Sequence, residues 1–261
     1  MNIKGKEGKY CMNDRKVEIV DLVNQHGQVT FKEIKDLFPN LSAMTVRRDL
    51  EELDREHALV RVHGGARSIG TIVGSEDLFR NRAVSYMEEK GTIAQKALPY
   101  ITPGYTMFFD SGSTVAELAR ILPDEQMIIF TGNISAALEM AHLKKPVIHM
   151  IGGRLDVQSL CVSDSCSLDM LNDVNINYAF FGVTGYSERR GFTCGKEEEY
   201  RLKKMVIDKS DKVIVLMDSS KVGISSVYTY AMEEDVDMVI SDSKLPPELL
   251  ERFGQNSVEV L

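Results

Sequence analysis

The 261-residue chain lacks several features that would place it outside the ordinary globular class. No apolar run approaches the ~18 residues of a membrane-spanning helix, and the first residues lack the apolar core of a secretion signal. Its four cysteines show neither C-x-x-C spacing nor a nearby pair of histidines, so free thiols are expected rather than a zinc site or a disulfide framework. These absences predict a cytoplasmic protein with no metal, no cofactor and no membrane partner.

The chain also lacks the short motifs of several enzyme classes. Its five histidines form no H-x-x-x-H pair, and neither a G-x-S-x-G elbow nor a G-x-x-x-x-G-K-[ST] loop occurs. The acidic run Glu197-Glu198-Glu199 could hold a catalytic base or a metal. The first turn of a solvated helix explains this run better, because the helix dipole favours carboxylates there. No residue is predicted to be catalytic.

Positive charge is scarce overall, and the formal net charge of −8 argues at first against a partner such as DNA. The excess of negative charge is unevenly distributed along the chain, however. Residues 1–67 carry 12 Lys+Arg against 11 Asp+Glu, a net of +1, and the remainder carries 19 against 28, a net of −9. Because charges are screened beyond ~8 Å at physiological salt, a distant acidic domain need not repel DNA from a basic helix. The asymmetry favours two domains, as does a length above the roughly 100–200 residues of one domain.

The first 67 residues have the pattern of a helix-turn-helix. Apolar residues on one helical face predict a first helix over residues 13–26. Thr30, followed three residues later by Glu33, forms a capping box that opens a second helix, which Pro39 ends. A third helix begins only a few residues later, which is the helix-turn-helix order.

The third helix is patterned for contact with DNA. Ser42 is a good N-cap, and apolar residues recur behind it at helical spacing, so the opposite face is left to solvent. The exposed half carries hydroxyl and guanidinium groups, which contact phosphates and guanine edges. An arginine pair on a merely solvated face is the alternative for this stretch taken alone. The residues predicted to contact DNA here are Ser42, Met44, Thr45, Arg47 and Arg48.

A small β wing is predicted after the third helix. Residues 58–62 alternate apolar and polar side chains and end at a pair of glycines, which predicts a strand at the edge of the wing. Arg61, His63 and Arg67 would lie near the backbone of a bound duplex. The expected division of the chain is a winged helix-turn-helix domain at 1–67, a linker at 68–78 and an effector-sensing domain at 79–261.

Beyond residue 79, strands and helices alternate several times, which is the signature of an α/β domain with a mainly parallel, Rossmann-like sheet. Each of five apolar runs is a candidate buried strand and is followed by a polar or glycine-containing loop. Ligands of open α/β sheets bind outside the carboxyl ends of the strands. The sequence therefore predicts a ligand site where these loops meet. The five runs are 107–109, 127–130, 147–151, 178–181 and 213–217.

The loop after the first run, residues 110–114, is the sharpest candidate. It is a strand-to-helix turn of small residues, whose backbone N–H groups and helix dipole could hold an anion. Lys221 could add a point charge to a phosphate, and Asp110 could accept from a sugar hydroxyl or hold the loop. One such loop is weak support, since Gly and Ser occupy tight turns everywhere, but five at one sheet edge are stronger. The predicted effector-binding residues are Asp110, Ser111, Gly112, Ser113, Thr114, Asn133, Gly152, Gly153, Arg154, Thr184, Gly185 and Lys221.

Most of the chain resembles a known family. Ser-Ala-Met-Thr-Val-Arg-Arg-Asp-Leu at 42–50 and Arg-Val-His-Gly-Gly-Ala at 61–66 are similar to the winged helix-turn-helix of DeoR-type bacterial transcription regulators. The five loops resemble that family's C-terminal sensor domain, which is similar to phosphosugar isomerases. Two loops depart from the family pattern: its Asp-x-Gly-Thr-Thr is Asp-Ser-Gly-Ser-Thr at 110–114, and its His-Ser-Lys is Ser-Ser-Lys at 219–221.

The resemblance implies a repressor of a sugar uptake or breakdown operon, released from double-stranded operator DNA by a phosphorylated sugar. A single short recognition helix rarely supplies enough specificity, so a homo-oligomer, dimer or tetramer, is expected. The alternative is a phosphosugar isomerase-like enzyme with an autoregulatory DNA-binding module, in which Asp110 or a carboxylate of Glu197–Glu199 would be the general base. The regulator is preferred, because a DNA-reading helix has no purpose in a plain isomerase.

Overall fold

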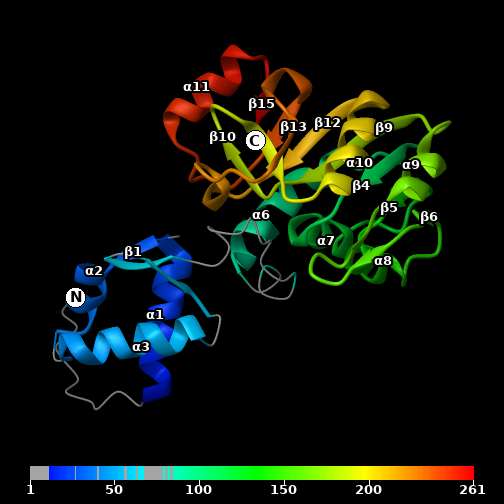
Figure 1. Cartoon of the computed structure of the whole chain (residues 1–261). Coiled ribbons are helices and arrows are strands. Elements are labelled where there is room, and N and C mark those ends of the chain that lie inside the picture. The colour runs from blue at the N-terminus through cyan, green and yellow to red at the C-terminus, as the bar shows by residue number, and fades with distance from the viewer. Residues whose placement is uncertain are drawn as a thin grey trace. The chain divides into compact units, whose positions relative to one another are not determined.

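The computed structural model describes residues 12–26, 28–39, 41–55, 58–62, 64–67, 79, 82 and 85–261. The chain divides into two compact units, residues 1–75 and 76–261, and each is described by itself (Figure 1). The predicted linker, residues 68–78, lies outside the described residues.

The first unit combines helices with a small antiparallel sheet of strand order β1-β3-β2. Its wing strands turn at Gly64, whose φ of 86° lies in the left-handed region that glycine adopts without strain. A Cβ on the next residue, Gly65, would lie 2.1 Å from the carbonyl oxygen of Val29, so this position admits only glycine. The elements are α1 (Met12–His26), β1 (Gln28–Thr30), α2 (Phe31–Leu37), α3 (Ala43–Arg55), β2 (Val60–Val62) and β3 (Gly65–Arg67).

The helical pattern seen in the sequence is confirmed in this unit. Thr30 caps α2 in a capping box with Glu33, as predicted. The apolar stripe of α3 is buried in a core shared by the three helices and the sheet. The wing strand is shorter than predicted, because residues 58 and 59 form a bend and only 60–62 pair with β3. The core residues are Ile19, Val23, Val29, Ile34, Phe38, Val46, Leu50, Leu53, Leu59 and Ala66.

The second unit is a doubly wound α/β domain, as predicted. Its helices are α6 (Met87–Ala97), α7 (Ser113–Arg120), α8 (Ile134–Met140), α9 (Ser165–Leu171), α10 (Glu197–Asp208) and α11 (Pro247–Gln255), with 3-10 turns η1 (Leu98–Tyr100), η2 (Ser219–Lys221) and η3 (Glu233–Asp235). Its strands are β4 (Thr106–Phe109), β5 (Ile128–Thr131), β6 (Val147–Met150), β7 (Leu155–Asp156), β8 (Cys161–Val162), β9 (Ile176–Gly182), β10 (Gly185–Ser187), β11 (Gly191–Cys194), β12 (Ser210–Leu216), β13 (Tyr228–Ala231), β14 (Met238–Ile240) and β15 (Glu259–Val260).

The main sheet of the second unit places the predicted loops at one edge. Within the described residues it has seven strands in the order β15-β14-β12-β9-β4-β5-β6, and every pairing in it is parallel. From β4 the chain winds outward to β5 and β6, and from β9 it winds the other way to β12, β14 and β15. The switch point therefore lies between β4 and β9, and open α/β sheets bind ligands in the crevice at such a point.

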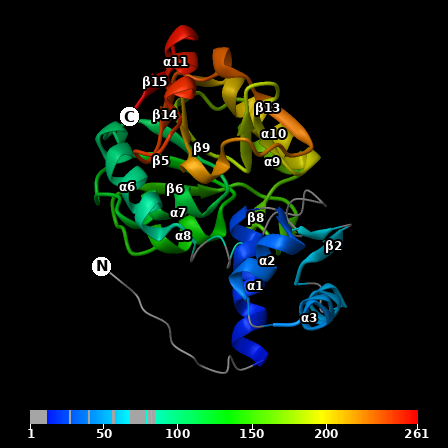
Figure 2. The ribbon, with the colours of Figure 1, turned by 90° about the vertical axis from the view of Figure 1, so that its left-hand side faces the viewer.

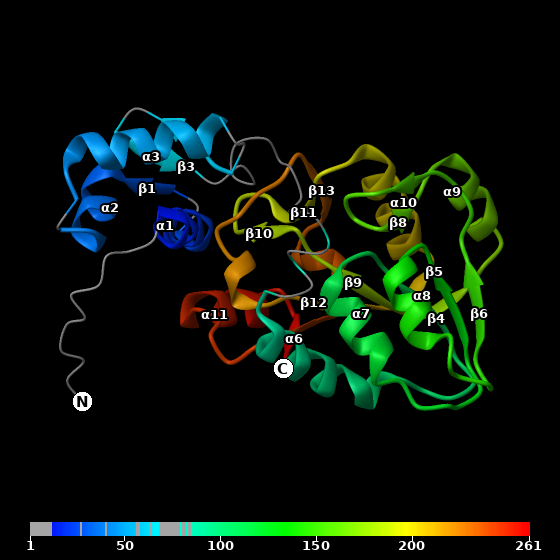
Figure 3. The same ribbon diagram turned by 90° about the horizontal axis from the view of Figure 1, so that it is seen from below.

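Helices cover both faces of this sheet (Figures 1 and 2). One hydrophobic core joins α6, α7 and α8 to one face, where α7 and α8 lie side by side (Figure 3). A second core joins α9, α10 and α11 to the other face, together with a small antiparallel sheet of order β10-β11-β13. The sequence did not predict this small sheet, nor β14 and β15.

Two further predictions can be compared with the structure. The run 147–151 was predicted as a buried strand, which is wrong: β6 lies at one edge of the described sheet, and Val147 and Met150 are exposed. Of the cysteines, Cys161 and Cys194 are buried and Cys166 is exposed, and Cys11 lies outside the described residues. No helix in the described ranges is long and apolar enough to cross a membrane.

Candidate DNA-binding surface and anion site

The start of α3 is fixed by Ser42. Its Oγ accepts from the backbone N–H of Thr45 at 3.1 Å and lies 2.9 Å from the Thr45 hydroxyl. This cap satisfies one of the free amides at the helix start and sets the angle at which the helix begins. Met44 beside it is 72% exposed although its side chain is apolar. An exposed Met on the first turn is available for contact with a partner.

Two arginines stand on the solvent side of the same helix. Arg48 has 72% of its side chain exposed and makes a long contact with Glu52, 3.4 Å from Nε to the carboxylate. Arg47 is exposed, and its guanidinium lies 5.6 Å from the centroid of the Phe31 ring. Exposed ion pairs contribute little to stability, so a phosphate can displace Glu52 at small cost.

The wing adds one further cation. Arg61 in β2 is exposed, and its Nη1 donates to Glu51 of α3 at 2.6 Å. Its backbone N–H donates to Asp54, which ties the wing strand to the helix. His63 and the Arg67 side chain, which were also predicted to lie near DNA, fall outside the described residues.

In the second unit, the predicted turn lies at the carboxyl end of β4 and opens α7. Gly112 is the N-cap of α7 with φ 105°, a conformation that favours glycine, and no side chain caps the helix. The Ser111 hydroxyl donates to Glu199 at 3.0 Å and the Ser113 hydroxyl to the Arg82 carbonyl at 3.4 Å. Because amides in the first turn have no acceptor within the helix, this uncapped start offers donors to an anion.

Asp110 is held at the switch point by a buried lysine. Lys203 of α10 has 1% of its side chain exposed, and its Nζ donates to Asp110 Oδ2 and, at 3.2 Å, to the Gly182 carbonyl. The Gly182 amide donates to the same carboxylate at 3.0 Å. Burial lowers the pKa of Lys203, but Asp110 and Glu199 beside it raise that pKa well above its ordinary value. Asp110 therefore holds the loop.

The next loop is built to support the turn. Asn133 is fully buried, and its side-chain amide donates to the Asp110 carbonyl at 3.1 Å and to the Gly112 carbonyl at 3.0 Å. Its side-chain oxygen caps α8 by accepting from Ala136 at 3.1 Å. Because these hydrogen bonds of the Asn133 side chain all join it to backbone groups, Asn133 supports the turn.

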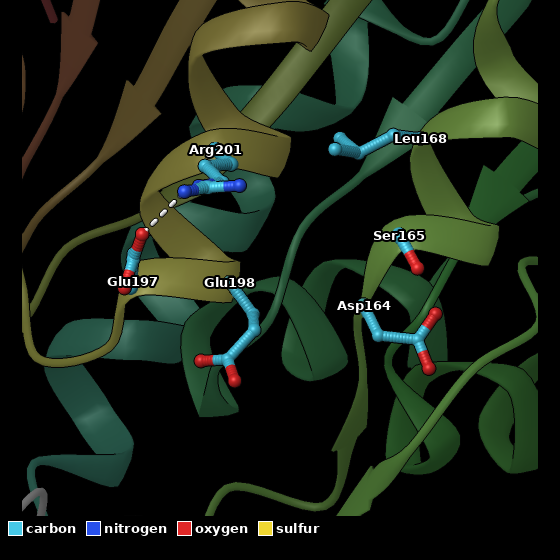
Figure 4. A pocket seen from close by; sticks show the side chains of 6 residues that line it. All are labelled: Asp164, Ser165, Leu168, Glu197, Glu198 and Arg201. Carbon is cyan, nitrogen blue, oxygen red and sulfur yellow. Dashed lines mark hydrogen bonds and ion pairs between the residues drawn. The ribbon is translucent and has the colours of Figure 1, made fainter.

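The third loop, residues 152–154, contacts residues that line a cavity of about 270 Å³ between α9 and α10 (Figure 4). Arg154 donates to Glu198 at 2.6 Å, and the Gly152 carbonyl accepts from Ser167 at 2.6 Å. Gly153 has φ 138° and lies so close to Asp164 that a Cβ would come within 2.8 Å of its carboxylate. The residues that line the cavity are Asp164, Ser165, Leu168, Glu197, Glu198 and Arg201.

The fourth loop belongs to the small antiparallel sheet. The Thr184 amide donates to the Thr193 carbonyl at 3.3 Å, and the Thr193 hydroxyl donates to the Gly185 carbonyl at 2.8 Å. A Cβ on Gly185 would lie 2.6 Å from the Ile224 carbonyl oxygen, so glycine is needed there for packing.

Lys221, a predicted effector-binding residue, lies in η2 after β12 and near Lys90, which in turn lies near Arg82; the sequence did not single out Lys90 or Arg82. Lys90 of α6 is buried, and its Nζ donates to the Ser85 carbonyl at 2.6 Å and to the Arg82 carbonyl. The pKa of Lys90 is lowered to about 8, mainly by burial; the charges of Lys221 and Arg82 also lower this pKa, and those of Asp218 and Glu117 raise it. The Arg82 Nε and Nη2 atoms are buried and have no hydrogen-bond partner among the residues that the structure describes. Lys90 thus lies close to two further cations, Arg82 and Lys221.

The arrangement does not suit the enzymatic alternative. Asp110 is engaged by Lys203 and Gly182, and Glu199 accepts from Ser111 and lies 3.3 Å from Lys203. Glu199 was predicted to be solvated, which is wrong, since its side chain is only 13% exposed. In the described part of the chain no group of three or more His, Cys, Asp or Glu side chains could hold a metal ion.

Comparison with known proteins decides between the two interpretations. Residues 15–71 match the model of the DeoR-like helix-turn-helix domain, and residues 85–243 match that of the DeoR C-terminal sensor domain. The chain belongs to the DeoR family. It is therefore a DNA-binding transcription regulator with a sensor domain, and not an enzyme.

This DeoR-family protein matches transcription regulators over most of their length. YulB of Bacillus subtilis, an uncharacterized HTH-type transcriptional regulator, is 32% identical over 95% of both chains. The lactose phosphotransferase system repressor of Staphylococcus epidermidis is 31% identical over 88% of this chain and 92% of its own. Ribose 5-phosphate isomerase A of Methanocaldococcus jannaschii superposes at a TM-score of 0.39 with 18% identity, over 53% of this chain and 55% of that chain. A superposition that loose says nothing about function.

Proposed function

We propose that this DeoR-family protein is a cytoplasmic repressor of a sugar uptake or breakdown operon, released from its operator by a phosphorylated sugar. The lactose phosphotransferase system repressor among its relatives supports a sugar-linked role. Binding to two half-sites would give the specificity that one short helix lacks, so the repressor acts as a dimer or tetramer.

In this proposal the exposed side of α3 enters the major groove. Arg47 and Arg48 contact guanine edges or phosphates, Met44 packs on a thymine methyl, and the Ser42 and Thr45 hydroxyls bind the backbone. Arg61 and His63 bind the flanking phosphates from the wing. The support is the exposure of Met44 and of both arginines on one short, capped helix.

The effector phosphate binds at the turn 111–114, with Lys221 as a counter-charge. One observation carries this assignment: the uncapped start of α7 contacts the Arg82 carbonyl through Ser113, and the buried Arg82 Nε and Nη2 atoms have no hydrogen-bond partner among the described residues. A buried donor without an acceptor is costly, and a phosphate oxygen would satisfy it. Lys90 lies near both Arg82 and Lys221, so the two lysines would add further positive charge to the site.

The direct test is release of operator DNA. Phosphorylated sugars are titrated against the complex, each beside its unphosphorylated parent. We expect one or more phosphates to release the DNA and the parent sugars to have no effect, because a neutral sugar leaves the cations unpaired. Release by a parent sugar at the same concentration would refute the phosphate assignment.

The affinity for the releasing phosphate should depend on pH through Lys90, whose pKa is about 8 in the free protein. A bound phosphate favours the charged lysine, so binding above pH 8 must take up a proton, and affinity should fall by up to about tenfold per pH unit there. The phosphate is a dianion above a pKa of about 6, which leaves an optimum between pH 6 and 8. Calorimetry from pH 6 to 9.5 measures this, and Lys90→Met should abolish the decline. A wild-type affinity that stays level above pH 8 would exclude Lys90 from the site.

A further inference from the structure

We infer that Arg15 and Lys16 of α1 are positioning residues for DNA reading, which hold the exposed side of α3 in its working arrangement without touching DNA themselves. Arg15 fixes how α3 is turned about its axis, and Lys16 keeps Glu52 from neutralising Arg48. The inference rests on the proposal that α3 enters the major groove. It gives a role in DNA binding to two cations that the sequence did not single out.

Arg15 is a cation withheld from solvent. Its side chain is 10% exposed, and that of its partner Asp49 on α3 is 4% exposed. Two hydrogen bonds join them: Arg15 Nε donates to Asp49 Oδ2 at 2.6 Å, and Nη2 donates to Oδ1 at 2.9 Å. A guanidinium that binds both carboxylate oxygens fixes the direction of the contact, which the point charge of a lysine does not. So deeply covered a side chain is not available to a phosphate, and its role must act through α3.

The fork supplies a direction that the surrounding core does not. The apolar stripe of α3 is buried with residues of α1 in one core, and apolar contacts are non-directional. The two helices also cross rather than run along each other, so they meet over a short length (Figures 1 and 3). Asp49 follows Arg48 directly in the chain. A rotation of α3 that breaks the Arg15 fork therefore also displaces Arg47 and Arg48.

Lys16 controls a carboxylate beside Arg48. Its Nζ lies 2.7 Å from Glu52 Oε2, and both side chains are largely covered. Arg48, one helical turn from Glu52, lies 3.4 Å from the other carboxylate oxygen. The pKa of Glu52 is held below its usual value mainly by Lys16 and to a smaller degree by Arg48. Lys16 is therefore the stronger partner of Glu52, which leaves the guanidinium of Arg48 to solvent or to DNA.

The two contacts predict different changes in DNA binding. Without the Lys16 charge, Glu52 closes on Arg48, because residues four apart on a helix are neighbours. Arg48 is then neutralised and binding weakens for every sequence, since phosphate attraction does not depend on sequence. Without the Arg15 fork, side chains are misplaced relative to base edges, and it is the preference for the operator that falls.

Two duplexes serve as probes. One is a duplex that the wild-type protein selects from a random-sequence pool, and the other is a scrambled duplex of the same length and base composition. Fluorescence anisotropy measures the affinity for each, and thermal unfolding is followed beside it. A smaller folded fraction lowers both affinities by the same factor and leaves their ratio unchanged. The ratio therefore reports positioning and not stability.

The main variant for Arg15 removes the whole pair: Arg15→Met, Asp49→Leu. The net charge is unchanged, and apolar replacements of buried ion pairs often keep or raise stability, so the first unit should unfold no earlier than in the wild type. The ratio should nevertheless fall by about tenfold or more, the loss of roughly one base contact. Wild-type discrimination by this variant overturns the role of Arg15.

A conservative variant covers the case in which the apolar pair does not fold. Arg15→Lys keeps the charge but not the fork, and should also lower the ratio. Arg120→Lys, which alters an exposed pair with Glu117 in the second unit, is the control and should leave the ratio unchanged. An Arg15→Lys protein that discriminates like Arg120→Lys overturns the role of Arg15.

Lys16 is tested by rescue. Lys16→Met should weaken binding to both duplexes several-fold, and adding Glu52→Gln should restore it, because Arg48 is then no longer neutralised. Adding Glu18→Gln restores the same net charge elsewhere on α1 and should not restore binding. Failure of Glu52→Gln to rescue, or equal rescue by Glu18→Gln, overturns the role of Lys16.

The failure of this inference is distinguishable from failure of the proposed function. If Arg47→Ala, Arg48→Ala binds the selected duplex like the wild type, α3 does not read DNA and the proposed DNA surface fails. If that variant loses affinity while the Arg15 variants discriminate like the wild type and Glu52→Gln gives no rescue, only the inference fails.

Discussion

Replacing Lys203 with Met is expected to lower the free energy of unfolding of the second unit by about 3–5 kcal/mol. The substitution leaves the Asp110 carboxylate buried without its counter-charge at the switch point between β4 and β9. The double variant Asp110→Asn, Lys203→Met should recover part of the loss, because the fully buried carboxylate is then replaced by a neutral amide. Urea unfolding followed by circular dichroism measures both.

The control for this prediction is an exposed ion pair. Lys145→Met removes a lysine that lies 3.1 Å from Glu125, with about half of each side chain exposed. Such pairs contribute roughly 0–1 kcal/mol, so this variant should unfold almost like the wild type. If Lys203→Met is as stable as Lys145→Met, the buried pair does not hold the loop, and Asp110 would again be open to another role.

Replacing Arg47 and Arg48 together with Ala is expected to weaken operator binding by about 100-fold or more. Each arginine that reads a base should contribute about 1–3 kcal/mol, and removal of an arginine that binds a phosphate should flatten the salt dependence by about one unit of slope. Fluorescence anisotropy on labelled operator at several salt concentrations separates the two cases: relaxed preference at one base marks base reading, and uniform weakening marks phosphate contact.

The chain supplies a matched control for this pair. Arg189 and Arg190 are also adjacent and exposed, and they lie in the turn between β10 and β11 of the second unit. Replacing both with Ala changes the net charge equally but should leave operator affinity unchanged. Equal loss in both double variants would mean that the effect is one of overall charge, and α3 would then not be the reading helix.

Features whose signal is local could be predicted from the sequence. The cap at Ser42, the capping box at Thr30 and the stripe of α3 each involve residues within one or two helical turns, so spacing alone predicts them. The turn 110–114 is likewise a contiguous strand-to-helix segment. The alternation of strands and helices along the chain was enough to predict a parallel sheet. Because the carboxyl ends of parallel strands lie at one edge, it also predicted that the five loops share that edge.

Features whose partners are distant in the chain could not be predicted. Lys203 and Asp110 are separated by 93 residues, and nothing in the pattern of α10 marks one lysine as buried. In the sequence, Lys90 has the pattern of an ordinary residue on a helix surface. Its charged neighbours become apparent only when α6 packs beside the loop that follows β12. The run of β6 is as apolar as the buried strands, but its place at the sheet edge depends on strand order, which composition does not determine.

The central claim is that a phosphate bound at the turn 111–114 beside Lys221 controls release from DNA. Binding can shift the repressor only if the phosphate favours the conformation of low DNA affinity. Removing the lysine should therefore affect release without affecting operator affinity in the absence of effector. Lys144→Ala, an exposed lysine between α8 and β6, is the matched control.

The measurement is a titration of the releasing sugar phosphate against operator complexes of wild type, Lys221→Ala and Lys144→Ala. All three should bind operator equally tightly. Lys221→Ala should need about 10–100 times more effector for half release, the loss expected of a charge-assisted contact of about 1.5–3 kcal/mol. Half release of Lys221→Ala at the wild-type concentration would contradict the account.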